Sequence, residues 1–448
     1  MNEVTSNELP GTEKLEEQIE LALAEARRLG VDQVEVAASH DKGLSTTVRL
    51  GEVESLEYSN DRGVWVTVYR NSRKGSASTS ETTPEAIREI VAKANSFAKL
   101  TAADEHSGLA DADMMCKDLR DLDLDHRWDI DAAAAIELAL ECEATALSYD
   151  KRIDNSEGAT VSSNRGVRAY GNSHGFVGSF RKSSHDITCV VLGSKNGDME
   201  RDYYYSSARD PADLENVRSI GETAARRTVA RLGARQIKTM RVPVIFIPEI
   251  ARGFIGHAIG AIAGGAQYRR SSFLLDAAGE KIFPDFVSVQ ERPHLLKAIA
   301  STSYDAEGVA TWDRDIFSDG VLQDYVLSSY SARRLGLKTT ANAGGTQNLI
   351  VPGNADDLEA LIAEMGTGLL VEDLIGQGVN GVTGDYSRGA VGHWVENGEI
   401  QYPVNEITIA GNLRELYKRI ELIGNDQDLR GGIRCGSLLV GEMTVAGS

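Results

Sequence analysis

The sequence contains little cysteine and little proline, and both shortages exclude classes of protein. Its four cysteines, Cys116, Cys142, Cys189 and Cys435, lie far apart and form no CxxC pair. That spacing suits neither a zinc ribbon nor a disulfide scaffold, and it favours a reducing compartment. The 9 prolines stand against 44 glycines in 448 residues. This balance indicates tight turns and bulges between strands rather than a Pro-rich disordered chain.

Long apolar segments are also missing. No segment approaches the roughly 18 uninterrupted apolar residues that a membrane-spanning helix requires. Residues 1–11 are polar and acidic and lack the apolar core of a signal peptide. We therefore expect a soluble, cytoplasmic protein that does not span a membrane.

Lysine and arginine are fewer than aspartate and glutamate. The formal net charge is -20 and the pI is near 4.9. A broad nucleic-acid surface needs clustered Lys and Arg to neutralise phosphates, so direct nucleic-acid binding is not expected. The 42% hydrophobic and 25% charged content is ordinary for a globular protein. The length allows roughly two to three domains, each with its own core.

The first half of the chain combines alternating and helical patterns. Apolar and polar residues alternate, as in half-buried antiparallel strands, over residues 33–37, 44–50 and 64–69. Turn residues occur between these segments, at 51–52 and 60–63. Helices are predicted over residues 13–29, 84–98, 131–149 and 211–232. Residues 163–173 faintly repeat residues 59–72, which suggests a duplicated hairpin.

The second half is richer in glycine and in short strand patterns. Helices are predicted there over residues 249–263, 324–335 and 356–365. Strands grouped with helices, without regular βα alternation, predict an α+β fold. We expect an N-terminal α/β domain of antiparallel strands and flanking helices over residues 1–235. A C-terminal β-rich domain with a few helices is expected over residues 236–448.

Three local patterns could indicate a nucleotide or metal site, but each is better explained as an ordinary structural feature. Gly376–Gly381 matches GxGxxG, but a turn-rich stretch follows in place of the helix that a dinucleotide site needs. His185 and Cys189 lie four residues apart in a strand-like segment, so a buried structural cysteine is favoured over a metal ligand. The acidic residues 118–125 alternate with leucine, which favours a solvated loop or edge strand over a cation site.

Several longer blocks resemble the TldD/PmbA family, and within it the subunit type called PmbA or TldE. In the second half they are Gly256–Gly265, Ser329–Lys338, Met365–Leu369, Gly384–Gly389, Glu396–Val404 and Ile409–Asn412. The first half agrees through Arg73–Ser78, Gly171–Gly175 and Asn196–Asp202. The resemblance covers nearly the whole chain.

The resemblance implies a metal site that this chain has lost. TldD resembles a zinc peptidase whose helix carries His-Glu-x-x-x-His, with a cysteine near the C-terminus completing the site. In this sequence the first His position is Gly256, the Glu position is His257 and the second His position is Ala261. The cysteine is retained as Cys435. One thiolate cannot hold catalytic zinc, and the general base is gone, so we expect no catalytic residue and no metal in this chain.

The resemblance therefore implies an accessory, zinc-free subunit of a TldD/TldE metallopeptidase. Its partner would be TldD, which would hold the zinc, and its substrates would be unfolded peptides. Family roles include removing the leader of a microcin and degrading an antitoxin.

The sequence leaves three alternatives open. Cys435 could act as a nucleophile with His257 as its base, in a hydrolase that works alone. The chain could be a peptide-binding or chaperone-like homodimer without enzymatic activity. A link of the family to DNA gyrase could mean direct nucleic-acid binding, against which the acidic balance argues.

Overall fold

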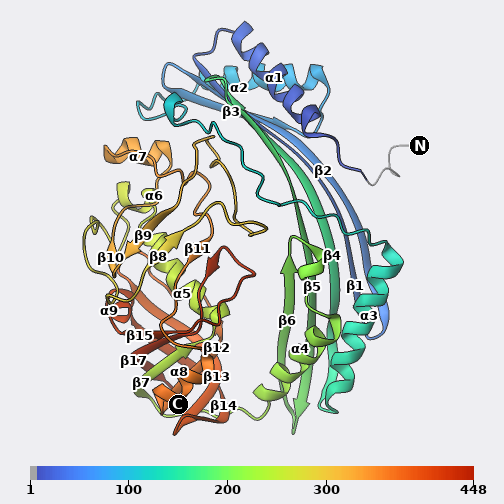
Figure 1. Ribbon diagram of the computed structural model, residues 1–448, viewed down its shortest axis with the longest axis vertical. Helices are drawn as coiled ribbons and strands as arrows, with labels where there is room; N and C mark the ends of the chain where they lie inside the picture. The colour runs from blue at the N-terminus through green and yellow to red at the C-terminus, as the bar shows by residue number, and fades with distance from the viewer. Residues whose placement is uncertain (1–7, 448) are drawn as a thin grey trace.

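The computed structural model describes residues 8–447, in which a long curved sheet from the first half bends around a β-rich second half (Figure 1). No helix in this part of the chain has the length and apolar character needed to cross a membrane. The strands of the two halves belong to separate sheets. The mixture of helices and largely antiparallel strands confirms the predicted α+β class.

The N-terminal sheet has the strand order β3-β2-β1-β4-β5-β6, and every neighbouring pair is antiparallel. Its strands are β1 (Gln33–Arg49), β2 (Glu52–Arg70), β3 (Arg73–Thr79), β4 (Ile153–Asn172), β5 (Val177–Lys195) and β6 (Asp198–Ala208). Strand β3 pairs only with residues 64–70 of β2. Within the described residues, the outer edge of β2 is therefore unpaired from Glu52 to Arg62.

Alternation along these strands gives the sheet one apolar and one polar face. Val64, Val66 and Val68 are buried against the helices, whereas Trp65 between them is half exposed. The apolar, convex face is covered by α1 (Thr12–Arg28), α2 (Pro84–Ala98), α3 (Ala132–Tyr149) and α4 (Val217–Arg231). The concave face turns toward the second half of the chain (Figure 1). One-sided burial is the usual solution for an antiparallel sheet.

The C-terminal half contains two further sheets. The larger has the order β14-β13-β12-β7-β17-β15, and an additional pairing between β14 and β17 closes the first five strands of this order into a ring. The smaller has the order β10-β9-β8-β11-β16. A core that includes Phe246, Phe254 and Tyr417 fills the space between them. Helix α5 (Pro248–Ala261) lies in this core, against β7, β12 and β16.

The remaining elements have the following bounds. The strands are β7 (Met240–Phe246), β8 (Val289–Glu291), β9 (Arg314–Ser318), β10 (Val321–Leu322), β11 (Leu349–Ile350), β12 (Gly368–Ile375), β13 (Asp385–Glu396), β14 (Glu399–Asn412), β15 (Ile420–Ile423), β16 (Ile433–Arg434) and β17 (Leu438–Ala446). The helices are α6 (Gly264–Tyr268), α7 (Ser329–Leu335), α8 (Leu358–Met365) and α9 (Leu413–Lys418), with short 3-10 turns at Ala112–Met114 and Pro211–Asp213.

Several predicted boundaries were wrong. The strands predicted at 33–37 and 44–50 are one strand, β1, and the turn predicted at 60–63 lies inside β2. Strand β1 pairs with β2 on one side and with β4 on the other, and both pairings continue through Gly43. Their hydrogen bonds override the local preference of residues 60–63 for a turn. The helix predicted from residue 324 begins only at Ser329, because Ser328 caps it through its hydroxyl. Helix α2, by contrast, has the predicted bounds.

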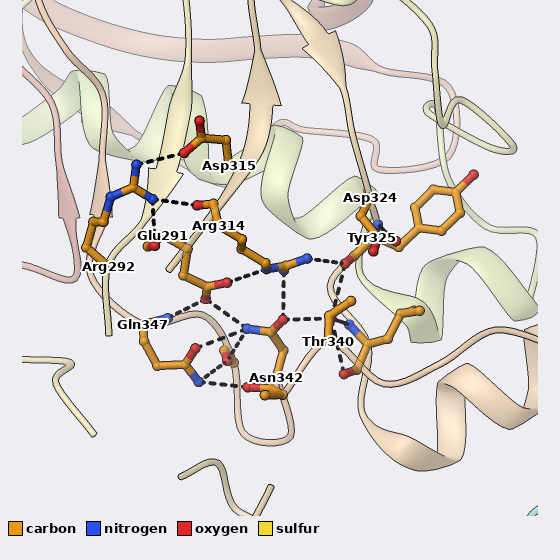
Figure 2. Close-up of polar contacts among 12 residues, drawn as sticks. Glu291, Arg292, Arg314, Asp315, Asp324, Tyr325, Thr340, Asn342 and Gln347 are labelled. Atoms are coloured by element: carbon orange, nitrogen blue, oxygen red, sulfur yellow. Dashed lines mark hydrogen bonds and ion pairs between the residues drawn. The ribbon is translucent and has the colours of Figure 1, made fainter. Parts of the chain in front are cut away.

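A buried polar network fixes the smaller C-terminal sheet (Figure 2). The Glu291 carboxylate pairs with Arg314 Nε at 2.7 Å and accepts hydrogen bonds from Asn342 Nδ2 and the Gln347 backbone N–H, each at 2.8 Å. Glu291 is 1% exposed. The network thereby connects β8, β9 and the 340–347 segment that leads into β11. Strand β11 in turn pairs with β16, which directly precedes Cys435.

Removal of the Glu291 carboxylate should therefore destabilise the C-terminal half. We expect Glu291→Ala to lower the free energy of unfolding by about 3–5 kcal/mol, since it leaves the Arg314 guanidinium buried and unpaired. Glu280→Ala is the matched control, because Glu280 pairs with Arg414 at the exposed surface and should change stability by about 0–1 kcal/mol. Urea denaturation followed by circular dichroism measures both. Equal effects of the two substitutions would contradict the structural role of the network.

Candidate functional site

Helix α5 carries the positions at which the sequence resembles a zinc motif. Pro248 occupies its first turn, where a missing N–H costs nothing. Its apolar residues recur at helical spacing, and Ala251, Phe254, Ile255, Ala258 and Ala261 are buried in the C-terminal core. The opposite face contains the exposed Gly253 and Gly260. The packing of the helix thus determines which of its positions face the core.

Gly256 and Ala261 lie in different surroundings. A Cβ atom added at Gly256 would contact only Ile433 Cδ1 of β16, at 3.6 Å. Ala261 is 5% exposed and belongs to the apolar core. Its backbone carbonyl accepts hydrogen bonds from Gln267 Nε2 at 2.7 Å and Ser272 Oγ at 2.6 Å. Neither side chain offers a lone pair to a metal ion.

His257 is partly buried beside two residues of β13. Its ring centroid lies 6.0 Å from that of Tyr386, in an edge-to-face arrangement. Burial, and then the Arg388 charge, lower the pKa of His257 below its ordinary value. Neither ring nitrogen has a hydrogen-bond partner within residues 8–447. The imidazole is therefore held neutral at physiological pH and is not oriented by any acidic group, as a catalytic base usually is.

Cys435 is enclosed in the C-terminal core. It is 0% exposed, and its Sγ donates a hydrogen bond to the Gly436 carbonyl oxygen at 3.3 Å. Burial, together with the charge of Asp426, raises the pKa of Cys435 to about 12. The Sγ makes no hydrogen bond to His257, and the thiol is protonated at physiological pH. Metal binding and nucleophilic attack both require the thiolate.

These residues do not fit a catalytic zinc ion. Such a site needs three protein ligands and an open position. Here the aligned positions supply a glycine, a histidine without an orienting partner, an alanine and an enclosed thiol. In the part of the chain that the structure describes, no group of three or more His, Cys, Asp or Glu side chains is arranged to hold a metal ion.

An ionic network, which the sequence did not reveal, holds the N-terminal end of α5. Glu249 pairs with Arg227 at 2.7 Å and with Arg430 at 2.9 Å. Burial would raise the pKa of Glu249, but the two guanidinium groups hold it below its ordinary value. Arg430 also donates to the Tyr205 carbonyl oxygen on β6 at 2.8 Å. The network therefore ties α5 to the N-terminal sheet. Its partners lie in three distant segments, so no local pattern indicated it.

The other patterns singled out in the sequence occupy structural positions. Residues 376–384 are turns that lead into β13, as predicted, and no helix opens on them. His185 and Cys189 lie on β5 and are fully buried, and His185 bonds to Ser163 and to the His126 carbonyl oxygen. The acidic segment 118–125 has no regular structure, as predicted, and Asp125 forms an ion pair with Arg165.

Comparison with protein families gives a consistent match along the chain. Three models of the PmbA/TldA metallopeptidase family match it, namely domain 1 at residues 34–98, the central domain at 125–232 and the C-terminal domain at 239–447. The chain is 48% identical to metalloprotease PmbA of Escherichia coli O157:H7, with 97% of this chain and 96% of that protein covered. It is 46% identical to a PmbA homolog of Haemophilus influenzae, with 97% of each covered.

Solved structures share the fold. A Bacteroides thetaiotaomicron protein named as a modulator of DNA gyrase superposes with a TM-score of 0.92 at 27% identity, covering 97% of this chain and 99% of that chain. TldE from Thermococcus kodakarensis superposes with a TM-score of 0.83 at 20% identity, covering 97% of this chain and all of that chain. The second likeness concerns the fold alone.

The space beside Gly256 leads to a stability prediction. Gly256→Ala should raise the free energy of unfolding by about 0.5–1 kcal/mol, because alanine restricts the unfolded chain and its Cβ meets no clash. Gly264→Ala is the contrasting control. Its Cβ would lie 2.3 Å from Ser331 Oγ, so it should lower stability by about 1–3 kcal/mol. Urea denaturation tests both signs, and a destabilising Gly256→Ala would show that the position is not open.

The enclosed thiol leads to a chemical prediction. With a pKa of about 12, Cys435 should resist alkylation by iodoacetamide at pH 8 in the native protein. It should react fully in concentrated urea. Mass spectrometry of the peptide containing Cys435 measures the reaction. Rapid labelling of the native protein would show that the Cys435 thiolate is accessible. It would then support the alternative in which Cys435 acts as a nucleophile.

Proposed function

Since the chain belongs to the PmbA/TldD metallopeptidase family, we propose that it is the zinc-free subunit of a two-chain peptidase. In this proposal the catalytic zinc is held by a TldD-type partner that retains the His-Glu-x-x-x-His helix. The present chain completes the enclosure around that zinc and guides unfolded peptides to it.

The donor set on α5 is the observation that carries this proposal. In a peptidase that binds its own zinc, helix and cysteine together supply three ligands and a general base. Here Gly256 and Ala261 supply none, and the Cys435 thiol is enclosed and protonated. A chain with this site needs a second protein to provide the chemistry, while the intact fold around α5 favours a retained role in assembly or substrate binding.

The concave face of the N-terminal sheet supports a role in handling peptides. Small hydroxyl side chains line its middle, where Ser45 bonds to Ser162 at 3.0 Å and Thr47 bonds to Thr160 at 2.9 Å. A surface lined by such small hydroxyl groups would discriminate little among the side chains of a bound peptide. Main-chain hydrogen bonds to an extended peptide would need a free strand edge, and β2 provides one from Glu52 to Arg62.

The tip of the β1–β2 hairpin supports a protein partner. Leu50, Val53, Leu56 and Tyr58 are exposed there, at 55%, 46%, 43% and 68% of their surfaces. Apolar side chains grouped beside an unpaired strand edge are typical of surfaces that another chain covers.

Metal analysis tests the zinc-free assignment directly. We expect the purified chain to contain no stoichiometric zinc by inductively coupled plasma mass spectrometry, even after incubation with zinc and removal of free metal on a desalting column. The zinc-bearing partner, treated in the same way, is the positive control. One tightly held zinc ion per chain would refute the assignment.

Reconstitution tests the subunit role. Mixing the chain with a TldD-type partner should give a complex that elutes as one species and cleaves an unfolded peptide that neither chain cleaves alone. Cys435→Ser in this chain should leave that cleavage intact, because the proposal places no chemistry at the thiol. Cleavage by the isolated chain that is abolished by Cys435→Ser would favour the independent hydrolase instead. A stable homodimer that ignores the partner would favour a peptide-binding or chaperone-like role.

A further inference from the structure

A cavity of about 620 Å³ lies between the concave face of the N-terminal sheet and residues 304–306. It is distinct from the surroundings of α5. Its walls come from β1, β2, β4 and β5 on one side and from a single loop of the C-terminal half on the other. Its volume lies within the range of pockets that hold small ligands or a few residues of a peptide.

Because side chains alternate between the two faces of a strand, the strand register determines which residues line this cavity. On β2 and β4 the side chains of Val64, Val66 and Val167 enter the helix-covered core. Trp65 and Arg168 lie on the opposite face and line the cavity. Phe180 on β5 adds a further aromatic surface. One wall is therefore aromatic and accessible, since Trp65 is 49% exposed.

Arg62 on β2 and Lys182 on β5 both line the cavity and form no ion pair within the described residues, but Arg62 is exposed, whereas Lys182 is partly buried. Its ammonium group makes no hydrogen bond and no ion pair within residues 8–447, although the side chain is mostly buried. Arg168, by contrast, pairs with Asp41 at 2.7 Å. Burial, and then the charges of Arg168 and Arg209, lower the pKa of Lys182. A half-buried ammonium group without a partner is costly, and an anionic ligand would remove that cost.

No carboxylate forms an ion pair with Lys182 within the described residues, although the charge of Asp41 acts to raise its pKa. The buried guanidinium of Arg209 donates only to backbone carbonyls, those of Ser183 and Ile299 at 2.6 Å and that of Ala298 at 3.4 Å. Asp305 lines the cavity, but its carboxylate already accepts hydrogen bonds from three backbone N–H groups. The carboxylates of Asp41 and Asp61 on the same wall would repel a polyanion such as a nucleic acid. A single negative charge is therefore the best match.

We propose that this cavity binds a carboxylate of an extended peptide, with the carboxylate on the Lys182 ammonium and the adjoining apolar groups against Trp65 and Phe180. The carboxylate comes either from the peptide's C-terminus or from an acidic side chain. This deepens the proposed function, on which it rests, by giving the peptide a fixed point on the present chain.

Three peptides of one length distinguish the sources of the carboxylate. They are Gly-Ser-Gly-Ser-Leu with a free C-terminus, the same peptide as its C-terminal amide, and the amide with Glu in place of the second Ser. Isothermal titration with the purified full chain should show binding of the free acid and at least tenfold weaker binding of the plain amide, the loss expected for one charge-assisted hydrogen bond. Tight binding of the Glu-containing amide identifies an acidic side chain as a sufficient source and also supports the proposal. Equal binding of the free acid and the plain amide, or no binding of any peptide, overturns it.

Matched variants place the binding at this cavity. Lys182→Met keeps the length and burial of the side chain but removes the charge, and it should weaken binding of the free acid at least tenfold. Lys182→Arg should stay within about threefold, since it keeps the charge. Lys195→Met, at the exposed end of the same strand, should have no effect. Trp65→Ala provides a second test at a position whose exposure makes misfolding no concern, with a loss of several-fold. Wild-type affinity in Lys182→Met, with its fold verified by circular dichroism, overturns the proposal.

The titration also separates this proposal from the subunit role. Binding is measured on the isolated chain, whereas the subunit role is measured as cleavage by the complex. A chain that binds the free acid through Lys182 but confers no peptidase activity on a partner would refute the subunit role alone. A chain that confers activity but binds without regard to Lys182 would refute the cavity assignment alone.

Discussion

The packing of helix α5 into the C-terminal core is the constraint on which the functional account depends. Phe254, Ile255 and Ala258 anchor the helix, and their burial fixes its rotation about its own axis. The same rotation determines whether each other residue of the helix faces the core or the opposite side. Gly256 and the His257 imidazole then lie at the positions where the resemblance to TldD leads us to expect a zinc ligand and a general base. The fold around α5 is intact while Gly256 and Ala261 offer no side-chain donor, and the proposed role as an accessory subunit rests on this combination.

Two sets of buried charges hold this helix in its surroundings. The pairing of Glu249 with Arg227 and Arg430 joins it to the N-terminal sheet, and the network around Glu291 holds the strands that lead to Cys435. Both sets connect segments that are far apart in the sequence. They leave the concave face of the sheet free. There the Lys182 ammonium has no hydrogen bond or ion pair within the described residues, whereas Arg168 pairs with Asp41 and Arg209 bonds to backbone carbonyls. A partly buried ammonium group without a partner, on the wall of a cavity, is a reason to consider an anionic ligand at that place.

The sequence was most informative where a local signal coincides with tertiary demand. Helix α2 has its predicted bounds because Thr83 caps it and its apolar residues recur on one side. The turn predicted at residues 60–63 was wrong because β2 continues through that segment, paired throughout with β1. The positions of Gly256, His257, Ala261 and Cys435 could be assigned from the resemblance, but the enclosure of the thiol could not, since it follows from packing. The sequence contained no signal that pointed to Lys182, because its lack of a partner depends on the arrangement of four strands and a distant loop.

In the proposed two-chain peptidase, the zinc ion belongs to the TldD-type partner. Anomalous diffraction at the zinc edge, recorded on crystals of the complex, tests this assignment most directly. We expect one strong anomalous peak for each pair of chains, on the His-Glu-x-x-x-His helix of the partner, and no peak near α5 of the present chain. A fully occupied peak next to His257 and Cys435 would rule out the zinc-free assignment, because it would show that this chain assembles a metal site of its own.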